Sequence, residues 1–369
     1  MKLLCIIQCT NLGGMEQSTL TLLKELRDLG HECTVISLNE LGPGAVRYSD
    51  AGFPVEGMAY RGPGGVGSFR ALRRRLRGHV ADGLILVGHN VMASQAIGNL
   101  CQGHRLLALH FHHRDTMPRW KWKLIYRQAC RRFDALSFAA EFMLDEARQI
   151  YPPLHGKECF VSFPIPIVDE DTMRCRDSRR MFRERANLPE DALVIGNAGW
   201  LIARKRWDVF LDCLAELRRT GVHVYAAIAG DGPLREQLQK RAHDLGLQGV
   251  VRWLGWQNDM EPFYAGIDAL LFNSDADAVG LTPAEAMMRG VPVVASVVYG
   301  GLSTLAGDCR GALVLPDHDT SAIVRRLAEL LSDRELRLQV GKEARQRMIE
   351  VGDPRLHAER VVKALRLGS

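Results

Sequence analysis

Residues 273–296 read NSDADAVGLTPAEAMMRGVPVVAS. The apolar run ALLF precedes this stretch and VPVVAS closes it, which predicts two buried strands joined by a glycine-containing turn and a helix start. Asp277 and Glu285 stand on either side of Gly280, eight positions apart. The stretch therefore places two carboxylates around a turn between buried strands.

The turn also contains a helix-capping pattern, which explains Glu285 without any ligand. Thr282 is expected as the N-cap and Pro283 in the first helical turn. Glu285 follows the cap by three positions, where its carboxylate can reach back to the cap amide. Asp277 lies before this helix beside small residues, and a buried carboxylate there needs a partner. Asp277 is therefore the more informative of the two.

The composition is that of a soluble globular protein. The chain has 369 residues, of which 47% are hydrophobic and 25% charged, so two domains of roughly 150 to 200 residues are expected. The nine cysteines form no CxxC pair, which predicts reduced thiols and no metal-ligand spacing. MKLLCIIQC is too short for a signal h-region and is interpreted as a buried strand. No segment approaches the ~18 to 20 apolar residues of a membrane span.

Short apolar runs alternate with amphipathic helical patterns along the chain, which predicts βαβ units and a parallel sheet. The run FPIPIVDEDTMRCRDSRR breaks the alternation, and ALVIGNAG restarts it. We therefore expect an α/β fold with two Rossmann-like, doubly wound parallel-sheet domains, residues 1–165 and 166–354. A C-terminal helix at about 355–369 is expected to pack back on the first domain. Ligands of such sheets bind at the carboxyl ends of the strands.

The strand ends of the first half carry a glycine turn and several polar residues. Gly13 and Gly14 separate the first strand from its helix, without the GxGxxG spacing of NAD-binding turns. This turn is either a close-approach site for a phosphate or substrate, or a plain tight turn. Two further strand ends carry candidate substrate contacts, with satisfied structural histidines as the alternative. They are His89, Asn90, His110, His112 and His113.

The strand ends of the second half carry cations and glycines. Arg204 and Lys205 follow ALVIGNAG, where the strand is expected to open into a helix. A diphosphate there would receive charge-assisted bonds, and the alternative is a solvated basic helix start. Gly230 and Gly232 in AGDGP form another close-approach turn.

These motifs resemble those of glycosyltransferase family 4, which comprises retaining enzymes of the GT-B fold. The segment NSDADAVGLTPAEAMMRGVPVVASVVYGG is similar to the family pattern S-x-x-E-G-F-G-x-x-x-x-E-A-M-A-x-G-x-P-V-V-A-S with its following Gly-Gly pair. AGWLIARKRWDVFL resembles G-R-L-x-x-x-K-G, and GGMEQSTLTLLKELRDLGHECTVIS resembles the family's N-terminal segment. The resemblance covers nearly the whole chain and implies two domains facing a cleft.

The resemblance implies a role for each matching residue. Glu285 would bind the ribose hydroxyls of a donor nucleotide, Asp277 the transferred sugar and Lys205 the leaving diphosphate. His110 would touch the donor sugar, so Asp277, Lys205 and His110 form the implied catalytic set. The remaining implied contacts fall into three groups: donor-binding Arg204, Gly280, Leu281, Thr282 and Gly230; the diphosphate and acceptor turn at Gly13 and Gly14; and the acceptor-side residues His89, Asn90 and His112.

Four departures from the family pattern stand out. Asp277 replaces the first glutamate, and Trp200 replaces the arginine after the strand glycine. Val279–Gly280 replaces Phe-Gly, and PIPIVDED replaces the usual linker N-G-V-D. These departures motivate a second hypothesis, in which the protein is a catalytically weak or inactive sugar-nucleotide or glycan-binding protein on the same scaffold. A sugar-nucleotide epimerase or a phosphorylase is a third.

The implied function is a retaining, metal-independent glycosyltransferase that uses a nucleotide sugar and no cofactor. UDP is favoured over GDP on family frequency alone. The acceptor would be a glycan or a lipid-linked molecule, in polysaccharide, lipopolysaccharide or glycolipid synthesis. The localisation expected from the sequence is cytoplasmic.

Basic residues concentrate in the first half. Residues 1–168 hold 20 Lys and Arg against 14 Asp and Glu, and the remaining residues hold 28 against 29. Two stretches without acids could contact the anionic inner face of a membrane, or form solvated helix faces with their aromatics packed inside. Their relevant side chains are Arg70, Arg73, Arg74, Arg75, Arg77, Arg119, Trp120, Lys121, Trp122 and Lys123. The charge is too patchy to favour nucleic-acid binding.

Overall fold

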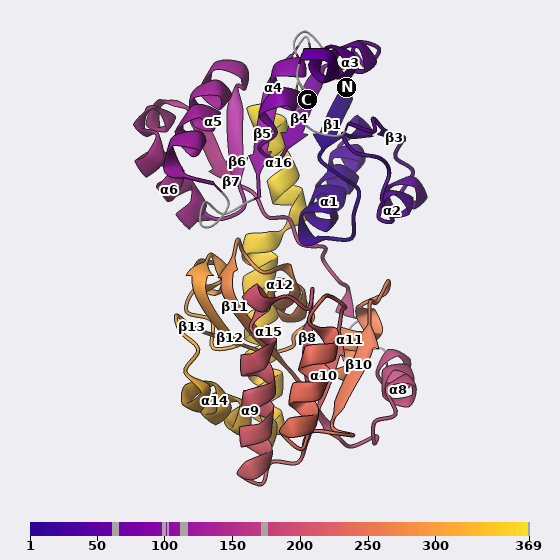
Figure 1. Ribbon diagram of the computed structural model, residues 1–369, viewed down its shortest axis with the longest axis vertical. Helices are drawn as coiled ribbons and strands as arrows, with labels where there is room; N and C mark the ends of the chain where they lie inside the picture. The colour runs from indigo at the N-terminus through magenta and orange to yellow at the C-terminus, as the bar shows by residue number, and fades with distance from the viewer. Residues whose placement is uncertain (61–65, 98–100, 102, 111–116, 171–175, 368–369) are drawn as a thin grey trace. The chain divides into compact units, whose positions relative to one another are not determined.

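The computed structural model describes residues 1–60, 66–97, 101, 103–110, 117–170 and 176–367. The chain divides into two compact units (Figure 1). Unit 1 comprises residues 1–164 and 352–369, and unit 2 comprises residues 165–351. The boundaries expected from the sequence follow residues 165 and 354.

Unit 1 is built on a parallel sheet of seven strands in the described part of the chain, in the order β3-β2-β1-β4-β5-β6-β7. The central strand β1 is buried from Leu3 to Ile7, as expected for a parallel strand covered on both faces. The strands are β1 (Lys2–Ile7), β2 (Glu32–Ser37), β3 (Val55–Gly57), β4 (Gly83–Val87), β5 (Arg105–Leu109), β6 (Ala135–Phe138) and β7 (Glu158–Val161).

Helices connect these strands, and a helix from the C-terminus completes the core. The helices of unit 1 are α1 (Gly14–Asp28), α2 (Ala45–Asp50), α3 (Val66–Leu76), α4 (Val91–Ala96), α5 (Arg119–Arg132), α6 (Glu141–Ile150), the 3₁₀ turn η1 (Pro152–Gly156) and α16 (Pro354–Ala364). Gly30 ends the first helical segment with φ +87°, a conformation that favours glycine. Ala358 and Val361 of α16 are fully buried in one cluster with Leu23 of α1.

Unit 2 is built on a second parallel sheet, with six strands among its described residues in the order β10-β9-β8-β11-β12-β13. The strands are β8 (Leu193–Ala198), β9 (Val224–Ala229), β10 (Val251–Gly255), β11 (Ala269–Asp277), β12 (Val293–Gly300) and β13 (Ala312–Leu315). The helices are α8 (Arg176–Arg185), η2 (Ala203–Lys205), α9 (Trp207–Arg219), α10 (Arg235–Asp244), α11 (Glu261–Gly266), α12 (Leu281–Met288), α13 (Leu302–Ala306), α14 (Thr320–Ser332) and α15 (Arg334–Gly352).

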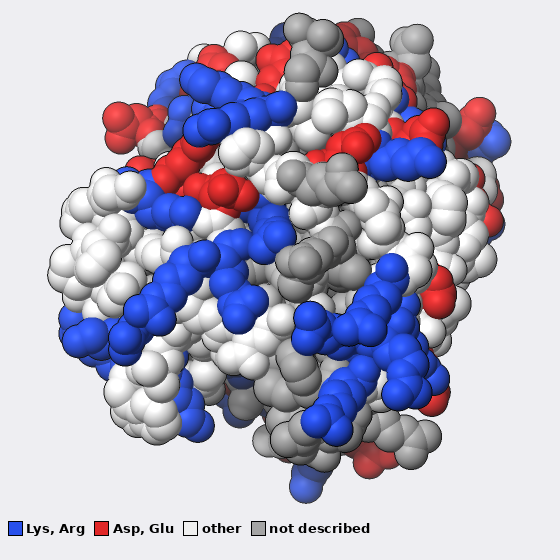
Figure 2. All heavy atoms as spheres, turned by 90° about the horizontal axis from the view of Figure 1, so that it is seen from above, with Lys and Arg blue, Asp and Glu red and all other residues white. Residues whose placement is uncertain are grey.

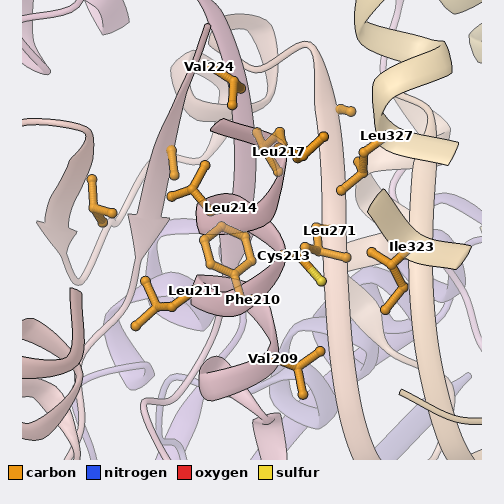
Figure 3. Close-up of a cluster of buried hydrophobic side chains, with 14 of the residues drawn as sticks. Val209, Phe210, Leu211, Cys213, Leu214, Leu217, Val224, Leu271, Ile323 and Leu327 are labelled. Atoms are coloured by element: carbon orange, nitrogen blue, oxygen red, sulfur yellow. The ribbon is translucent and has the colours of Figure 1, made fainter. Parts of the chain in front are cut away.

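The core of unit 2 forms where α9 packs on the sheet. Phe210, Leu214 and Leu217 recur at helical spacing and are at most 1% exposed, which gives α9 one continuous apolar face. Figure 3 shows these side chains beside Leu271 of β11 and Ile323 of α14. Burial of this face fixes α9 against the sheet, and with it the turn that precedes the helix.

Both sheets are parallel throughout their described strands, so all strands of each sheet end at one edge. In both units the candidate site segments predicted from the sequence follow β1, β4, β5, β8, β9 and β11 at this carboxyl edge. Among the described residues, no helix combines the length and apolar character needed to cross a membrane.

Candidate functional site

Lys205 and Asp277 meet at the carboxyl edge of the sheet of unit 2. Lys205 ends the 3₁₀ turn η2, and its Nζ forms an ion pair with Oδ2 of Asp277, the last residue of β11. The two side chains are only 16% and 17% exposed. Nζ also lies 4.7 Å from the ring centroid of Phe272. Asp277 thus has the partner that a largely buried carboxylate requires.

The segment around Lys205 differs from the predicted helix start. Arg204 and Lys205 belong to a 3₁₀ turn, and α9 begins only at Trp207. Arg206 separates the two elements with φ 43° and ψ 48°, a left-handed conformation. Arg204 is exposed, and its carbonyl accepts a hydrogen bond from Ser274 Oγ at 3.2 Å. The prediction that a strand opens directly into a helix here is wrong.

A second ionic chain lies beside the first. Arg206 Nη1 is 3.1 Å from Oδ1 of Asp275, which is also 3.0 Å from His318 Nε2. His318 Nδ1 is in turn 2.6 Å from Ser296 Oγ, which accepts a bond from Asn273 Nδ2. These contacts link β11, β12 and the segment that follows β13. Ser296 is fully buried, so this serine, histidine and aspartate array presents no accessible nucleophile.

The helix that carries Glu285 begins differently from the expected capping box. Gly280, with φ 86°, is the N-cap of α12, and no side chain caps it. Thr282 instead donates through Oγ1 to the carbonyl of Ala198 at 3.0 Å, which fastens the helix start to the end of β8. Glu285 accepts a hydrogen bond from Tyr264 Oη at 2.7 Å. The capping-box prediction for Thr282, Pro283 and Glu285 is wrong, because both polar side chains bond to neighbouring elements.

The glycines at the ends of β8 and β9 allow two turns to touch. A Cβ on Gly230 would lie 2.0 Å from the carbonyl oxygen of Gly199, and both residues have positive φ. A Cβ on Gly232 would lie 2.7 Å from the backbone nitrogen and from the carbonyl oxygen of Leu201. These contacts are within the protein, so they explain both glycines of AGDGP by backbone packing.

Two tryptophans stand at the same edge of unit 2. Trp200 follows β8 and Trp256 follows β10, with ring centroids 5.4 Å apart. They are 49% and 37% exposed. Trp200, which replaces the arginine of the family pattern, therefore places an indole at the strand end.

The glycine turn of unit 1 lies next to a carboxylate. Gly13 is the N-cap of α1, and Gly14 is the first residue of that helix. A Cβ on Gly13 would lie 2.5 Å from Glu16 Oε2, and Glu16 Oε1 accepts a bond from Cys9 Sγ at 3.3 Å. Burial raises the pKa of Glu16. The helix start therefore already has an acidic side chain of the protein beside it.

Amide side chains link three strand ends of unit 1. Asn90 is the N-cap of α4 and accepts a bond from the Ala93 amide at 2.9 Å. Its Nδ2 donates to Gln8 at 2.8 Å, and Gln8 donates to Asn39 at 3.0 Å. Asn90 therefore has a complete structural explanation as a helix cap within an amide chain.

The histidines at the strand ends of unit 1 are held neutral. Burial lowers the pKa of His89, whose ring lies 5.3 Å from that of the buried Trp122. Burial also lowers the pKa of His110, which follows β5, to about 4. Both are therefore uncharged near pH 7. His112 and His113, proposed beside them, lie outside the described residues.

Four side chains of unit 2 were missed from the sequence: one contacts Glu285, and the other three form the second ionic chain. They are Tyr264, Arg206, Asp275 and His318. Arg206 and Asp275 are immediate neighbours of motif residues, and charge pairing across RKR and DAD could have suggested them. Tyr264 lies 21 positions from Glu285, and its contact depends on the packing of α11 against the sheet.

Two family models match the chain in the same order as the two units. The model for Glycosyltransferase Family 4 matches residues 12–157. The model for Glycosyl transferases group 1 matches residues 178–347.

Curated relatives match parts of the chain. The lipopolysaccharide core biosynthesis glycosyltransferase LpsE of Rhizobium meliloti is 29% identical over 167 residues, 45% of this chain and 48% of LpsE. The D-inositol 3-phosphate glycosyltransferase of Streptomyces avermitilis is 33% identical over 212 residues, 54% of this chain and 45% of the relative. The chain thus spans about half the length of the curated relatives it matches.

The solved structures extend the likeness to the whole fold. Anabaena HepE in complex with UDP matches with a TM-score of 0.82, covering 99% of this chain and 100% of HepE at 18% identity. At that identity the likeness shows the fold, which is GT-B, in agreement with the two parallel sheets. With the two family models and the motif residues 273–301, it follows that the chain belongs to glycosyltransferase family 4.

Proposed function

We propose that this protein is a retaining, metal-independent glycosyltransferase that transfers a sugar from a nucleoside diphosphate sugar to a glycan or lipid-linked acceptor. The observation that carries the proposal is the Lys205–Asp277 pair at the sheet edge of unit 2. It combines a cation suited to a diphosphate with a carboxylate suited to a sugar, and α12, which carries Glu285, starts four positions after the last residue of β11.

Lys205 would stabilise the charge that develops when the bond between the anomeric carbon and the diphosphate oxygen breaks. Preorganised groups of this kind are each worth ~3 to 4 kcal/mol. The ammonium is already held by Asp277 and by the ring of Phe272, so it loses little conformational freedom when a phosphate binds. The backbone of Gly280, Leu281 and Thr282, at the start of α12, would add amide donors to the phosphates.

Asp277 would hold a hydroxyl of the transferred sugar and stabilise its developing positive charge. Its ion pair with Lys205 supports this role, because Lys205 is the cation that would receive the diphosphate. We favour attack by the acceptor on the face that the diphosphate leaves, assisted by the leaving phosphate. A double displacement through Asp277 is the alternative.

The proposal gives the remaining predicted residues binding roles. Glu285 would accept hydrogen bonds from the ribose, and Arg204 and Gly230 would lie along the nucleotide. In unit 1, His110 would contact the transferred sugar, and a neutral imidazole can both donate to and accept from hydroxyl groups. The turn at Gly13 and Gly14, together with His89, Asn90 and His112, would serve the acceptor.

UDP is the proposed nucleotide, supported by the UDP complex of HepE, which has the same fold. The test is a thermal-shift screen of the purified chain with UDP, GDP, ADP and their sugars. Release of nucleoside diphosphate is then followed with a panel of glycan and lipid-linked acceptors, with and without EDTA. The anomeric configuration of the product, read by NMR, tests retention. A stabilised protein that transfers to no acceptor would instead support a sugar-nucleotide-binding protein, the alternative that Trp200 motivates.

We also propose that unit 1 contacts an anionic bilayer. Figure 2 shows Lys and Arg side chains gathered in groups on one face of the molecule. On α5, Trp120 and Leu124 are 60% and 54% exposed, whereas Trp122 is buried in the core. Only one of the two tryptophans noted in the sequence is thus available. The exposed cations on or next to α3 and α5 include Arg70, Arg73, Arg74, Arg77, Arg119, Lys121 and Lys123; Arg75 is also exposed and donates to the carbonyl of Met58.

The exposed apolar pair makes this proposal testable. Trp120→Ala should weaken binding to vesicles of anionic phospholipid by about tenfold, because an interfacial indole is lost. Trp256→Ala, which removes an exposed indole from unit 2, is the matched control and should leave vesicle binding unchanged. Co-sedimentation that is insensitive to salt, or equal losses in both variants, would contradict a bilayer contact through α5.

A further inference from the structure

Tyr264 is a buried phenol whose hydroxyl contacts two residues of α12, Thr282 and Glu285. It lies in α11 and is 1% exposed. Its ring lies 5.3 Å from that of Phe263 in an edge-to-face arrangement. Burial raises the pKa of Tyr264 well above its ordinary value, so the hydroxyl keeps its proton throughout the working range of pH.

The hydroxyl has one proton to donate, and the distances show where it goes. Tyr264 Oη lies 2.7 Å from Glu285 Oε2 and 3.4 Å from the carbonyl oxygen of Thr282. The first distance is typical of a strong bond from a hydroxyl to a carboxylate, and the second is long for an O–H donor. The phenol therefore donates to Glu285.

An ion pair holds the phenol from its other side. The guanidinium of Arg289 lies 4.7 Å from the centroid of the Tyr264 ring. The same guanidinium bonds to both carboxylate oxygens of Glu261 and donates to the backbone carbonyl of Glu285 at 3.0 Å. Arg289 thus links α11 to α12, the same two helices that the Tyr264–Glu285 hydrogen bond joins.

The geometry fixes one carboxylate oxygen of Glu285 by a rigid donor. A glutamate has three side-chain torsions, and ordering such a side chain costs up to about 2 kcal/mol. Because Tyr264 orders the carboxylate in the free protein, a ligand that binds Glu285 does not have to supply this ordering free energy. A phenylalanine in the same place would keep the ring packing and the contact with Arg289, and would remove only this bond.

We propose that Tyr264 is a positioning residue for nucleotide recognition, which holds the carboxylate of Glu285 in the orientation that accepts the ribose hydroxyls. This inference rests on the proposed function, in which Glu285 binds the ribose. Tyr264 itself touches no substrate. It sets how strongly the protein distinguishes a ribonucleotide from one that lacks the ribose hydroxyls.

The experiment compares UDP with 2′,3′-dideoxyuridine diphosphate by calorimetry. The wild-type protein should prefer UDP, and Glu285→Gln should lose most of that preference. Tyr264→Phe should reduce the preference about tenfold, by weakening UDP binding and leaving the dideoxy compound within about twofold. With a donor sugar, KM should rise by a similar factor while kcat stays within about twofold, since the ribose contact is made equally in the ground state and the transition state.

Tyr225→Phe is the matched control. Tyr225 lies in β9 of the same unit, with Arg252 5.4 Å from its ring centroid, so the same hydroxyl is removed from a similar ring and cation pair. This variant should keep the full preference. Because the preference is a ratio measured within each variant, partial unfolding cancels from it.

The outcomes separate the inference from the proposed function. If the wild-type protein prefers UDP, and Tyr264→Phe keeps that preference, the positioning role is refuted while the ribose role of Glu285 stands. If the wild-type protein and Glu285→Gln bind both compounds equally, Glu285 has no ribose role. In that case the proposed site fails before Tyr264 is considered. Non-additive losses in the double variant of Tyr264 and Glu285 would support a shared interaction.

Discussion

The carboxyl edges of the two parallel sheets differ in the side chains that they carry. In unit 2, the described edge residues include two ionic contacts, Lys205 with Asp277 and Arg206 with Asp275. In unit 1, the corresponding edge includes an amide chain that starts at Asn90 and a histidine, His110, that burial keeps neutral. Parallel sheets offer the edge in both cases, and the residues that follow each strand decide what it can bind.

This difference suggests that the two units bind different parts of the substrates. Charged groups with fixed partners are suited to an anionic diphosphate, for which charge-assisted bonds are the strongest available. Neutral amides and imidazoles are suited to sugar hydroxyls, which both donate and accept hydrogen bonds. The comparison therefore agrees with the proposal that unit 2 takes the donor nucleotide and unit 1 the acceptor.

The largest expected effect is on turnover after loss of the charged pair. Lys205→Ala should lower kcat by about 10²- to 10³-fold, because it removes a group that stabilises the leaving diphosphate. Asp277→Asn should reduce turnover far more than Asp277→Glu, which keeps the charge and restores the family residue. Initial rates of nucleoside diphosphate release measure both effects.

Arg241→Ala provides the control for this experiment. Its side chain pairs with Asp212 between α9 and α10, so the substitution removes a cation from the same unit away from the motif residues. It should leave turnover within about twofold. Full activity in both Lys205→Ala and Asp277→Asn would show that the ionic edge of unit 2 is structural only.

In unit 1, the second expected effect is on stability, because His110 should make the unfolding free energy depend on pH. The pKa of His110 is about 4 in the folded protein, below the ~6.5 of an unfolded histidine. Between these values the unfolded chain binds more protons, so stability is fully present above about pH 6.5 and is lost as the pH falls toward 4. The His110 contribution to unfolding free energy should decrease by about 2 kcal/mol between pH 7 and pH 5.

Urea denaturation of the wild-type protein and of His110→Gln at these two pH values measures this contribution. The variant should show a smaller pH dependence, with a remainder from His31 and His89, whose pKa values burial also lowers. His243→Gln is the control, since that side chain is 71% exposed. Equal pH dependence in the wild-type protein and His110→Gln would mean that His110 is not held neutral by burial.

The amide chain of unit 1 should contribute a smaller, structural effect. Asn90→Ala removes the N-cap of α4 and the bond to Gln8, and should lower the unfolding free energy by about 1 to 2 kcal/mol. Asn90→Asp keeps the acceptor for the Ala93 amide and loses only the donor to Gln8, so it should lose less. Thermal unfolding ranks the three proteins. If the aspartate variant is as unstable as the alanine variant, the cap is not the dominant interaction.

The fold followed from the sequence because its signals are local and repeated. Apolar runs such as LLCII and the amphipathic face of α9 gave the parallel sheets and their helices. The site followed only in part. Glu285 was expected to bond to its own helix cap, and it bonds to Tyr264, 21 positions earlier. The local capping rule failed because tertiary packing supplied a better donor, and sequence spacing carries no record of that contact.

The smallest expected effect concerns Asp275, and it decides how much of the ionic edge is functional. Its carboxylate is 50% exposed and contacts both Arg206 and His318. An ion pair this exposed is worth about 0 to 1 kcal/mol, so Asp275→Asn should lower thermal stability only slightly, and less so at high salt. Because Arg206 precedes α9 in a left-handed conformation and directly follows Lys205, release of Arg206 should loosen the turn and raise the donor KM a few-fold.

Asp208→Asn removes the other carboxylate on Arg206, which makes it the matched comparison. If Asp275→Asn changes stability but not KM, while Lys205→Ala abolishes turnover, the ionic edge of unit 2 separates into one functional pair and one structural pair. If both variants impair turnover equally, the whole turn from Arg204 to Arg206 acts as a single unit.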